Sequence, residues 1–126
     1  MIQSQYNGAP GPGTVYTQEF IEVLASTDLQ AKLPGGILLK KGQGVLKKGT
    51  VIGKITAAGA DKDKAVAYKA SANDGSEVAL CILDNDCDTT LSDIGASAWI
   101  AGIFTESKLT GIDTAAKTAL KLCYFV

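Results

Sequence analysis

Two short segments in the middle of the chain have the residue pattern of β-strands, and tight turns separate them. In the first, residues 49–57, positions 51, 53 and 55 would share one face of a strand. The second, Val78–Leu83, is a continuous apolar run that fits a strand covered on both faces. It follows Asn73-Asp74-Gly75, a strong turn signal because these residue types tolerate positive φ. These segments predict a small β-rich domain.

Further strands and one helix are predicted on both sides of this centre. Short strands are expected at residues 14–17 or 20–23, 37–39, 65–69, 98–104 and 123–126, with a helical turn near Glu106–Leu109. Apolar residues at positions 112, 115, 116, 119 and 120 follow the period of a helix. Asp113 is placed to cap that helix, because its carboxylate can accept from the free amides of the first turn. The fold class is therefore predicted as α+β, mostly β.

The beginning of the chain differs in composition from the rest. The chain has 126 residues, which fits one domain, and residues 7–13 read Asn-Gly-Ala-Pro-Gly-Pro-Gly. Glycine and proline both oppose regular strand pairing. We therefore expect a flexible arm over residues 1–17 that is ordered only by a partner, followed by a folded domain over residues 18–126. A frayed terminus without a role is the alternative.

Charge and residue usage argue against several classes of function. The net charge is −1 and the charges are scattered, whereas nucleic-acid binding needs a concentrated basic face. The chain has no His, and all 12 basic residues are Lys, so the commonest general base and the bidentate anion clamp are both missing. No apolar segment approaches the length of a membrane span, and the start of the chain lacks the pattern of a secretory signal. We expect a protein that is not an enzyme, is made in the cytoplasm and binds neither nucleic acid nor membrane.

The three cysteines, Cys81, Cys87 and Cys123, are too few and too unevenly spaced for a structural zinc site. An odd number cannot close fully into intrachain disulfides, which indicates a reducing compartment. Cys81 and Cys123 lie in apolar runs and are interpreted as small core residues.

Asp84, Asp86 and Asp88 resemble the first three ligands of a calcium-binding loop. The pattern then fails, because Thr89 occupies the glycine position and Gly95 the glutamate position. We interpret this segment as a solvated acidic loop, and no metal or cofactor is predicted.

Lys47, Lys48 and Lys54 surround the glycine-containing segment Gly49–Gly53. A phosphate-binding loop would need a Gly-Lys-Ser/Thr ending and a following helix, and neither is present. A lipoyl- or biotinyl-type carrier domain, which presents one modified Lys on a hairpin, stays open as an alternative function, although no Lys has the expected sequence context. The simplest interpretation is that these lysines keep strand edges and turns soluble.

Several features in order along the chain resemble the phage head decoration proteins, the family of the bacteriophage lambda head decoration protein. The resemblance runs from about Leu33 to Val126. It consists of a Pro-Gly turn after the arm, Gly49-Thr50-Val51-Ile52-Gly53-Lys54-Ile55-Thr56, Lys69 through Asp74-Gly75-Ser76, Val78–Leu83 with its acidic Asp84–Asp88, Ala101-Gly102-Ile103-Phe104 leading to Leu109, and a small helix before Tyr124-Phe125-Val126.

The resemblance implies a β-tulip-like domain with a short helical subdomain near the C-terminus. It also implies a capsid decoration protein that binds the outer surface of the expanded head as homotrimers at three-fold positions and stabilises it against internal DNA pressure. The partners would be the major capsid protein and further copies of the chain. The arm residues expected to touch the shell are Gln3, Gln5, Tyr6, Thr14, Val15, Tyr16 and Thr17, and the expected trimer or core packing residues are Trp99, Tyr124 and Phe125.

Overall fold

A computed structural model describes residues 22–126 of the chain, which form ten strands, one α-helix and one 3₁₀ turn. The strands are β1 Leu24–Lys32, β2 Ile37–Leu39, β3 Val45–Leu46, β4 Val51–Lys54, β5 Ala65–Ala67, β6 Ala79–Leu83, β7 Cys87–Asp88, β8 Ile94–Ala96, β9 Ala98–Phe104 and β10 Cys123–Phe125. The 3₁₀ turn is Glu106–Lys108 and α1 is Thr114–Ala119. The prediction of a mostly β domain with a short helix near the C-terminus is confirmed.

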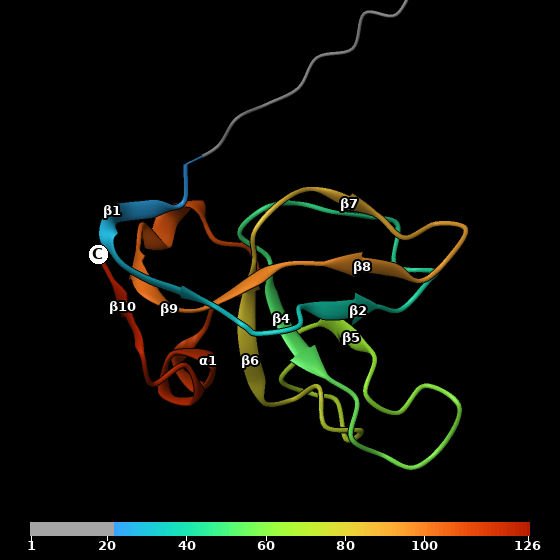
Figure 1. Ribbon diagram of the computed structural model, residues 1–126. Helices are drawn as coiled ribbons and strands as arrows, with labels where there is room; N and C mark the ends of the chain where they lie inside the picture. Colours follow the sequence, from blue (N-terminus) through green and yellow to red (C-terminus); the bar gives the residue numbers. More distant parts are fainter. Residues whose placement is uncertain (1–21) are drawn as a thin grey trace, which may run out of the picture.

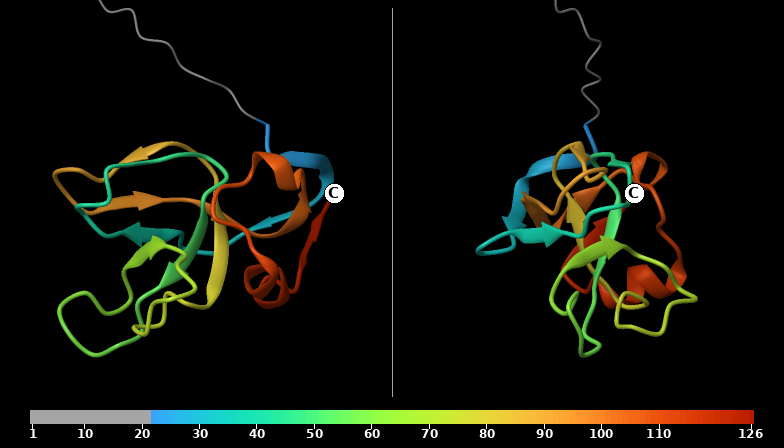
Figure 2. Two further views of the ribbon diagram at one scale, coloured as in Figure 1. Left: turned by 180° about the vertical axis from the view of Figure 1, so that it is seen from behind. Right: turned by 90° about the vertical axis from the view of Figure 1, so that its right-hand side faces the viewer.

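One large sheet organises the molecule. Its strand order is β1-β9-β6-β4-β5-β2-β8, β10 joins it by pairing with β9, and β3 and β7 form a separate two-stranded ribbon. Figure 1 shows β4 and β6 crossing the middle, with β1, β9, β10 and α1 on one side and β2, β5, β7 and β8 on the other. The views in Figure 2 show the same division.

The sheet separates two hydrophobic cores. Val51, Ile82 and Trp99 are paired across β4, β6 and β9, and all three belong to the core that α1 covers. Ile52 and Cys81, the next pair along β4 and β6, belong to the second core. Because neighbouring strand residues point to opposite faces, the central strands are buried on both sides. This confirms most of the prediction for the apolar run 78–83, but Val78 precedes β6 and is 58% exposed, and Leu80 is 36% exposed.

The first strand differs from its prediction. Residues 14–17 lie outside the described residues, and Glu22 and Val23 precede β1 instead of belonging to a strand over 20–23. The polar sequence of β1 is held as a strand by antiparallel pairing with β9, from Leu24 opposite Phe104 to Lys32 opposite Trp99. The register shifts three times along this pair. Such long-range pairing overrides the weak local pattern.

Three further short strands, β3, β7 and β8, are absent from the sequence-based prediction. Cys87 of β7 pairs with Leu46, and Ile94 of β8 pairs with Leu39. The segment that was expected to be a solvated acidic loop therefore enters a strand at Cys87, which is buried. Each of these strands is only two or three residues long, and its partner lies far away in the sequence.

The helix prediction is confirmed in position and in its cap. The carboxylate of Asp113 accepts a hydrogen bond of 2.7 Å from the amide of Ala116. The hydroxyl of Tyr68, 45 residues earlier, also donates to this carboxylate at 3.0 Å. The cap thus fixes the start of α1 and ties the helix to the segment after β5.

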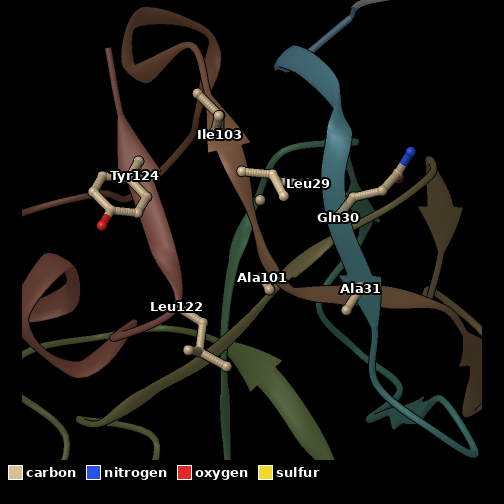
Figure 3. A pocket seen from close by; sticks show the side chains of 8 residues that line it. Leu29, Gln30, Ala31, Ala101, Ile103, Leu122 and Tyr124 are labelled. Carbon is tan, nitrogen blue, oxygen red and sulfur yellow. The ribbon is translucent and has the colours of Figure 1, made fainter.

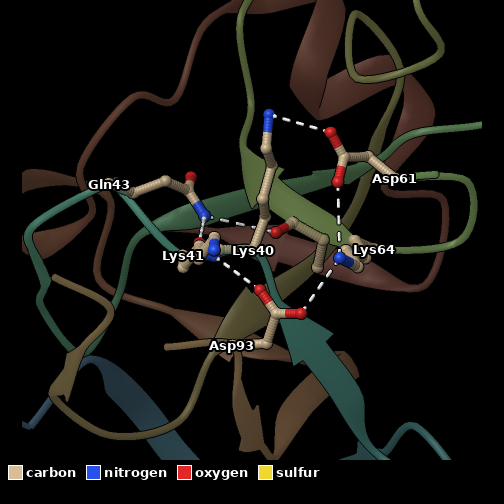
Figure 4. A network of polar contacts seen from close by, with 7 residues as sticks. Lys40, Lys41, Gln43, Asp61, Lys64 and Asp93 are labelled. Atoms are coloured by element: carbon tan, nitrogen blue, oxygen red, sulfur yellow. Dashed lines mark hydrogen bonds and ion pairs between the residues drawn. The ribbon is translucent and has the colours of Figure 1, made fainter. Parts of the chain in front are cut away.

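A network of ion pairs joins the segments next to β2 and β8 to the loop that precedes β5 (Figure 4). The ammonium group of Lys64 lies 3.0 Å from Asp93 and 3.3 Å from Asp61, and Lys40 lies 3.2 Å from Asp61. Asp93 also accepts a hydrogen bond of 2.9 Å from the amide of Lys41. The loop over residues 61–64 is therefore tied to the segments beside β2 and β8.

One glycine in β4 is required by a close backbone contact. A Cβ atom added to Gly53 would lie 2.5 Å from the carbonyl oxygen of Ser76 and 2.8 Å from its Cα atom. Ser76 is only 3% exposed, and its carbonyl accepts from the amide of Lys69 at 3.2 Å, so it has little room to move.

We predict that Gly53→Ala lowers the free energy of unfolding by about 1–3 kcal/mol, because the added methyl group overpacks a buried backbone contact. Urea unfolding followed by the fluorescence of the single tryptophan, Trp99, measures this change. Gly95→Ala is the matched control, since an added Cβ there meets nothing within 4 Å. Equal unfolding midpoints for the two variants would contradict the prediction.

We also predict a pH dependence of stability from the network of Figure 4. The side chains of Lys40 and Lys64 lower the pKa of Asp61, and the amide of Lys41 together with Lys64 lowers that of Asp93, both from an ordinary value of 3.8. Their contribution to stability is complete above that value and is lost as the pH falls through the lower folded pKa. Asp93 and Asp61 raise the pKa of Lys64 above 10.5, so its contribution is present below 10.5 and is lost as the pH rises through the raised value.

The measurement is the unfolding midpoint of wild type and Asp93→Asn across the acid range. The variant is expected to be less stable near neutral pH and to lose less stability on acidification. Asp63→Asn is the control, because it removes a carboxylate 3.5 Å from Lys54 that takes no part in this network. Parallel acid profiles for wild type and Asp93→Asn would refute the assignment.

Candidate functional site

The described chain begins and ends at the same corner of the molecule (Figure 1). The amide of Thr105, just after β9, donates to the carbonyl of Val23 at 2.8 Å. The amide of Glu106 donates to the carbonyl of Val126 at 2.9 Å, and the amide of Val126 donates to Phe104 at 2.9 Å. The two ends of the described chain are therefore both fastened to the end of β9.

Strands β1, β9 and β10 form a small three-stranded unit at this corner. β10 runs parallel to β9, with Cys123 opposite Gly102 and Phe125 opposite Phe104. Leu24, Phe104 and Cys123 point into the core on one side of this unit. The other side carries a shallow groove of about 380 Å³, shown in Figure 3. The residues that line it are Leu29, Gln30, Ala31, Ala101, Gly102, Ile103, Leu122 and Tyr124.

The outer side of this unit is unusually apolar for a sheet face that meets water. Leu29 is 65% exposed, Leu122 64% and Tyr124 72%. A sheet with one buried face normally alternates apolar and polar residues, so that polar side chains cover the solvated face. Contiguous exposed apolar surface on a soluble domain commonly marks an interaction site. We refer to Leu29, Ala31, Ala101, Ile103, Leu122 and Tyr124 as the outer face.

The three aromatic residues predicted for packing lie in different environments. Trp99 is 3% exposed and contacts Phe104 edge-on, with ring centroids 5.7 Å apart. Phe125 is partly buried and stacks on Phe104 at 6.2 Å. Tyr124, which directly precedes Phe125 in β10, is on the outer face. The predicted arm residues Gln3, Gln5, Tyr6, Thr14, Val15, Tyr16 and Thr17 lie outside the described residues.

Polar contacts connect buried Trp99 to the groove. Its indole nitrogen donates to the side-chain oxygen of Gln30 at 3.0 Å, and Gln30 is one of the groove residues. The ammonium group of Lys48 lies 5.6 Å from the centre of the Trp99 ring, a distance at which the cation is attracted by the ring. The fluorescence of Trp99 is therefore a local reporter of this corner.

The acidic segment that resembles a calcium loop has its carboxylates directed to separate partners. Asp84 pairs with Lys32 and Ser97, and Asp86 accepts from the amide of Lys48 at 2.7 Å. Asp88 accepts from the hydroxyl group of Thr90. Within residues 22–126, no group of three or more His, Cys, Asp or Glu side chains converges as metal ligands would.

The glycine-containing segment before β4 does not present free amides to an anion. The amide of Gly49 donates to the carbonyl of Leu83 at 2.9 Å, and that of Val51 donates to Thr110 at 2.9 Å. The amide of Thr50 bonds to the carbonyl of Lys47 at 3.1 Å. Because backbone amides are what a phosphate-binding loop offers its ligand, this segment is used instead to join β4 to its neighbours.

All three cysteines are buried free thiols. Burial raises the pKa of Cys81 to about 12 and that of Cys123 to about 11. A thiol with so high a pKa is almost wholly protonated near neutral pH and is therefore a poor nucleophile and metal ligand. The interpretation of Cys81 and Cys123 as small core residues is confirmed.

Sequence reasoning did not find the outer face. Its residues come from three segments far apart in the chain, and Leu29 and Ala31 lie in the polar stretch whose strand was not predicted. The available signal was the run Cys123-Tyr124-Phe125-Val126, because neighbouring side chains of a strand point to opposite faces and an apolar strand at the edge of a domain exposes one of them.

Among the residues that the structure describes, no helix combines the length and the apolar character required to cross a membrane.

Comparison with known proteins agrees with the resemblance seen in the sequence. The family model of bacteriophage lambda head decoration protein D matches residues 17–123. No curated protein matches the chain. The matched segment includes β1, the central strands, α1 and the beginning of β10, and thus nearly all of the described fold. The chain therefore belongs to the family of bacteriophage lambda head decoration protein D.

Proposed function

We propose that this protein binds the outer surface of an expanded phage head as trimers and stabilises the head against the pressure of its packaged DNA. The observation that carries the proposal is the family match over residues 17–123. The major capsid protein is the proposed partner, and the function is structural and not catalytic. We further infer that the protein is made in the host cytoplasm, where its free thiols would stay reduced.

The proposed contact with the shell lies in an arm, residues 1–17, that precedes the body, residues 18–126. Within this arm, the residues proposed to touch the shell are Gln3, Gln5, Tyr6, Thr14, Val15, Tyr16 and Thr17. Ordering such a segment costs about 1–2 kcal/mol for each residue fixed. Pairing of the arm with the edge of a capsid sheet could offset that cost through main-chain hydrogen bonds.

The segment of the body that follows the arm is firmly bonded to the rest of the domain. The segment that leads into β1 is bonded at Val23 to Thr105, which follows β9 directly. β9 is in turn paired with β1, β6 and β10. A force applied at the beginning of β1 would therefore be shared by the centre of the sheet and would not fall on one exposed strand.

Trimer formation would make weak arms sufficient. When three arms belong to one particle, binding of the first raises the effective concentration of the other two. Such coupling can strengthen overall binding by roughly 10²–10⁴-fold without a new contact. With such coupling, no single strong anchor would be needed on each chain.

We predict that the full chain co-sediments with expanded, undecorated heads of the parent phage and that deletion of residues 1–17 weakens binding by about 100-fold, through loss of the coupled arms. A full-length chain with residues 1–17 in scrambled order is the matched control for length and composition. Unchanged emission of Trp99 reports that the body of each variant is folded.

Decorated heads are also expected to retain their DNA at temperatures at which bare heads release it. Equal binding by the truncated and full chains would move the contact from the arm to the body. No binding by any form, or no gain in heat resistance of the heads, would overturn the proposed function.

A further inference from the structure

The described chain enters the body of the protein at one fully buried side chain. Val23 is 0% exposed and belongs to the core that α1 covers, whereas Glu22, directly before it, is exposed. We propose that Val23 is the anchor at which tension carried by the arm is transferred to the folded body. This inference rests on the proposed function, which supplies the tension, and it assigns a mechanical role to one residue.

Three segments that are far apart in the sequence hold Val23. The amide of Thr105 donates to its carbonyl at 2.8 Å, at the point where β9 ends. A Cβ atom added to Gly49 would lie 2.9 Å from the Cγ1 atom of Val23 and 3.0 Å from the carbonyl oxygen of Lys108. A side-chain carbon of Leu109 lies 3.6 Å from the same point. Val23 is therefore packed between the turn before β4 and the segment that follows β9.

The turn against which Val23 packs is itself bonded to the centre of the sheet. Gly49 has a φ of +91°, which residues with a side chain rarely adopt, and its missing side chain leaves the room that Val23 occupies. The amide of Gly49 donates to the carbonyl of Leu83, the last residue of β6, at 2.9 Å. Its carbonyl accepts from the amide of Thr110 at 3.0 Å. Tension that reaches Val23 would therefore pass to β4 and β6 as well as to β9.

The strand that follows Val23 would be a weaker point of attachment. Between Ser26 and Ala31, β1 has more residues than the facing part of β9, so the ladder of hydrogen bonds is interrupted. Under tension, the bonds of such a ladder would break one after another from the end. A buried side chain ahead of the ladder protects it, because Val23 must leave the core before β1 can be peeled from β9.

Filling the core and holding the arm are separable roles, because Val51 has the first without the second. Val51 is 1% exposed, belongs to the same core and lies in β4, where it is paired with Ile82. Truncation of either valine to alanine leaves a cavity in this core and lowers stability in urea. Only the change at Val23 lies on the path from the arm into the body.

Pulling on the full chain at constant force tests the inference. One handle is attached to the N-terminus and the other to a cysteine introduced by Leu91→Cys, since Leu91 is 90% exposed between β7 and β8. The three native cysteines are buried and would not compete for the handle. The measured quantity is the rate of unfolding under tension, and urea unfolding of the same variants measures stability without tension.

Val23→Ala is expected to unfold about tenfold faster than the parent chain under tension, because a contact that is lost before the barrier raises the unfolding rate. Val51→Ala is the matched control. It is expected to unfold within about twofold of the parent rate, because its contacts are still present at that barrier. Both variants should lose a similar amount of stability in urea.

Thr105→Pro is a second variant, which leaves the side chains of the core in place. Thr105 has a φ of −82°, close to the value that proline requires, and its side chain makes no capping hydrogen bond to the 3₁₀ turn. The substitution removes the amide that donates to the carbonyl of Val23. It is expected to raise the unfolding rate under tension severalfold.

Two outcomes would overturn the inference. One is an equal acceleration in Val23→Ala and Val51→Ala, which would make Val23 an ordinary core residue. The other is a rate under tension that stays at the parent value in both Val23→Ala and Thr105→Pro. The measurement uses no heads, so a chain that failed to bind heads would refute the proposed function and leave the result at Val23 unaffected.

Discussion

The pairing of β9 with three other strands is the constraint on which the rest of the structure depends. Its first residues pair with β6, its last with β10, and β1 runs along it on the other side. Trp99 and Phe104, at the two ends of this strand, meet in one core. Gly102 lies where β9 pairs with β10, and a Cβ atom there would come within 3.0 Å of the Phe104 ring. The close packing of β9 thus joins α1 and β10 to the centre of the sheet.

Much of the central fold could be predicted because its signals are local. The apolar runs of β6 and β9 and the cap at Asp113 each contain their own evidence within a few residues. β1, β3, β7 and β8 could not be predicted in the same way. Ile94 is in a strand because Leu39 lies opposite it, and Cys87 because Leu46 does. A sequence pattern does not contain a partner some 40 or more residues away, and two- or three-residue strands have no periodicity of their own.

The same limit explains what could be foreseen of the candidate site. The run Cys123-Tyr124-Phe125 indicates an apolar strand, but an unbroken apolar run does not determine which of its two faces packs against the core. Pairing with β9 decides this, because it places Phe125 against Phe104 and leaves Tyr124 72% exposed. The outer face exists only because β1 and β10 both pair with β9 and so bring their side chains together. It is a property of the topology and not of any one segment.

An exposed apolar face of limited extent is compatible with the proposed function, in which the protein stays in solution until it reaches the head. A larger or more hydrophobic face would favour association before assembly. In the proposed trimer three arms act together, so each contact can be weak and the whole can still be stable, since each bond formed raises the effective concentration for the next. A particle held in this way would form where the capsid brings copies together, so that the shell itself selects the place of assembly.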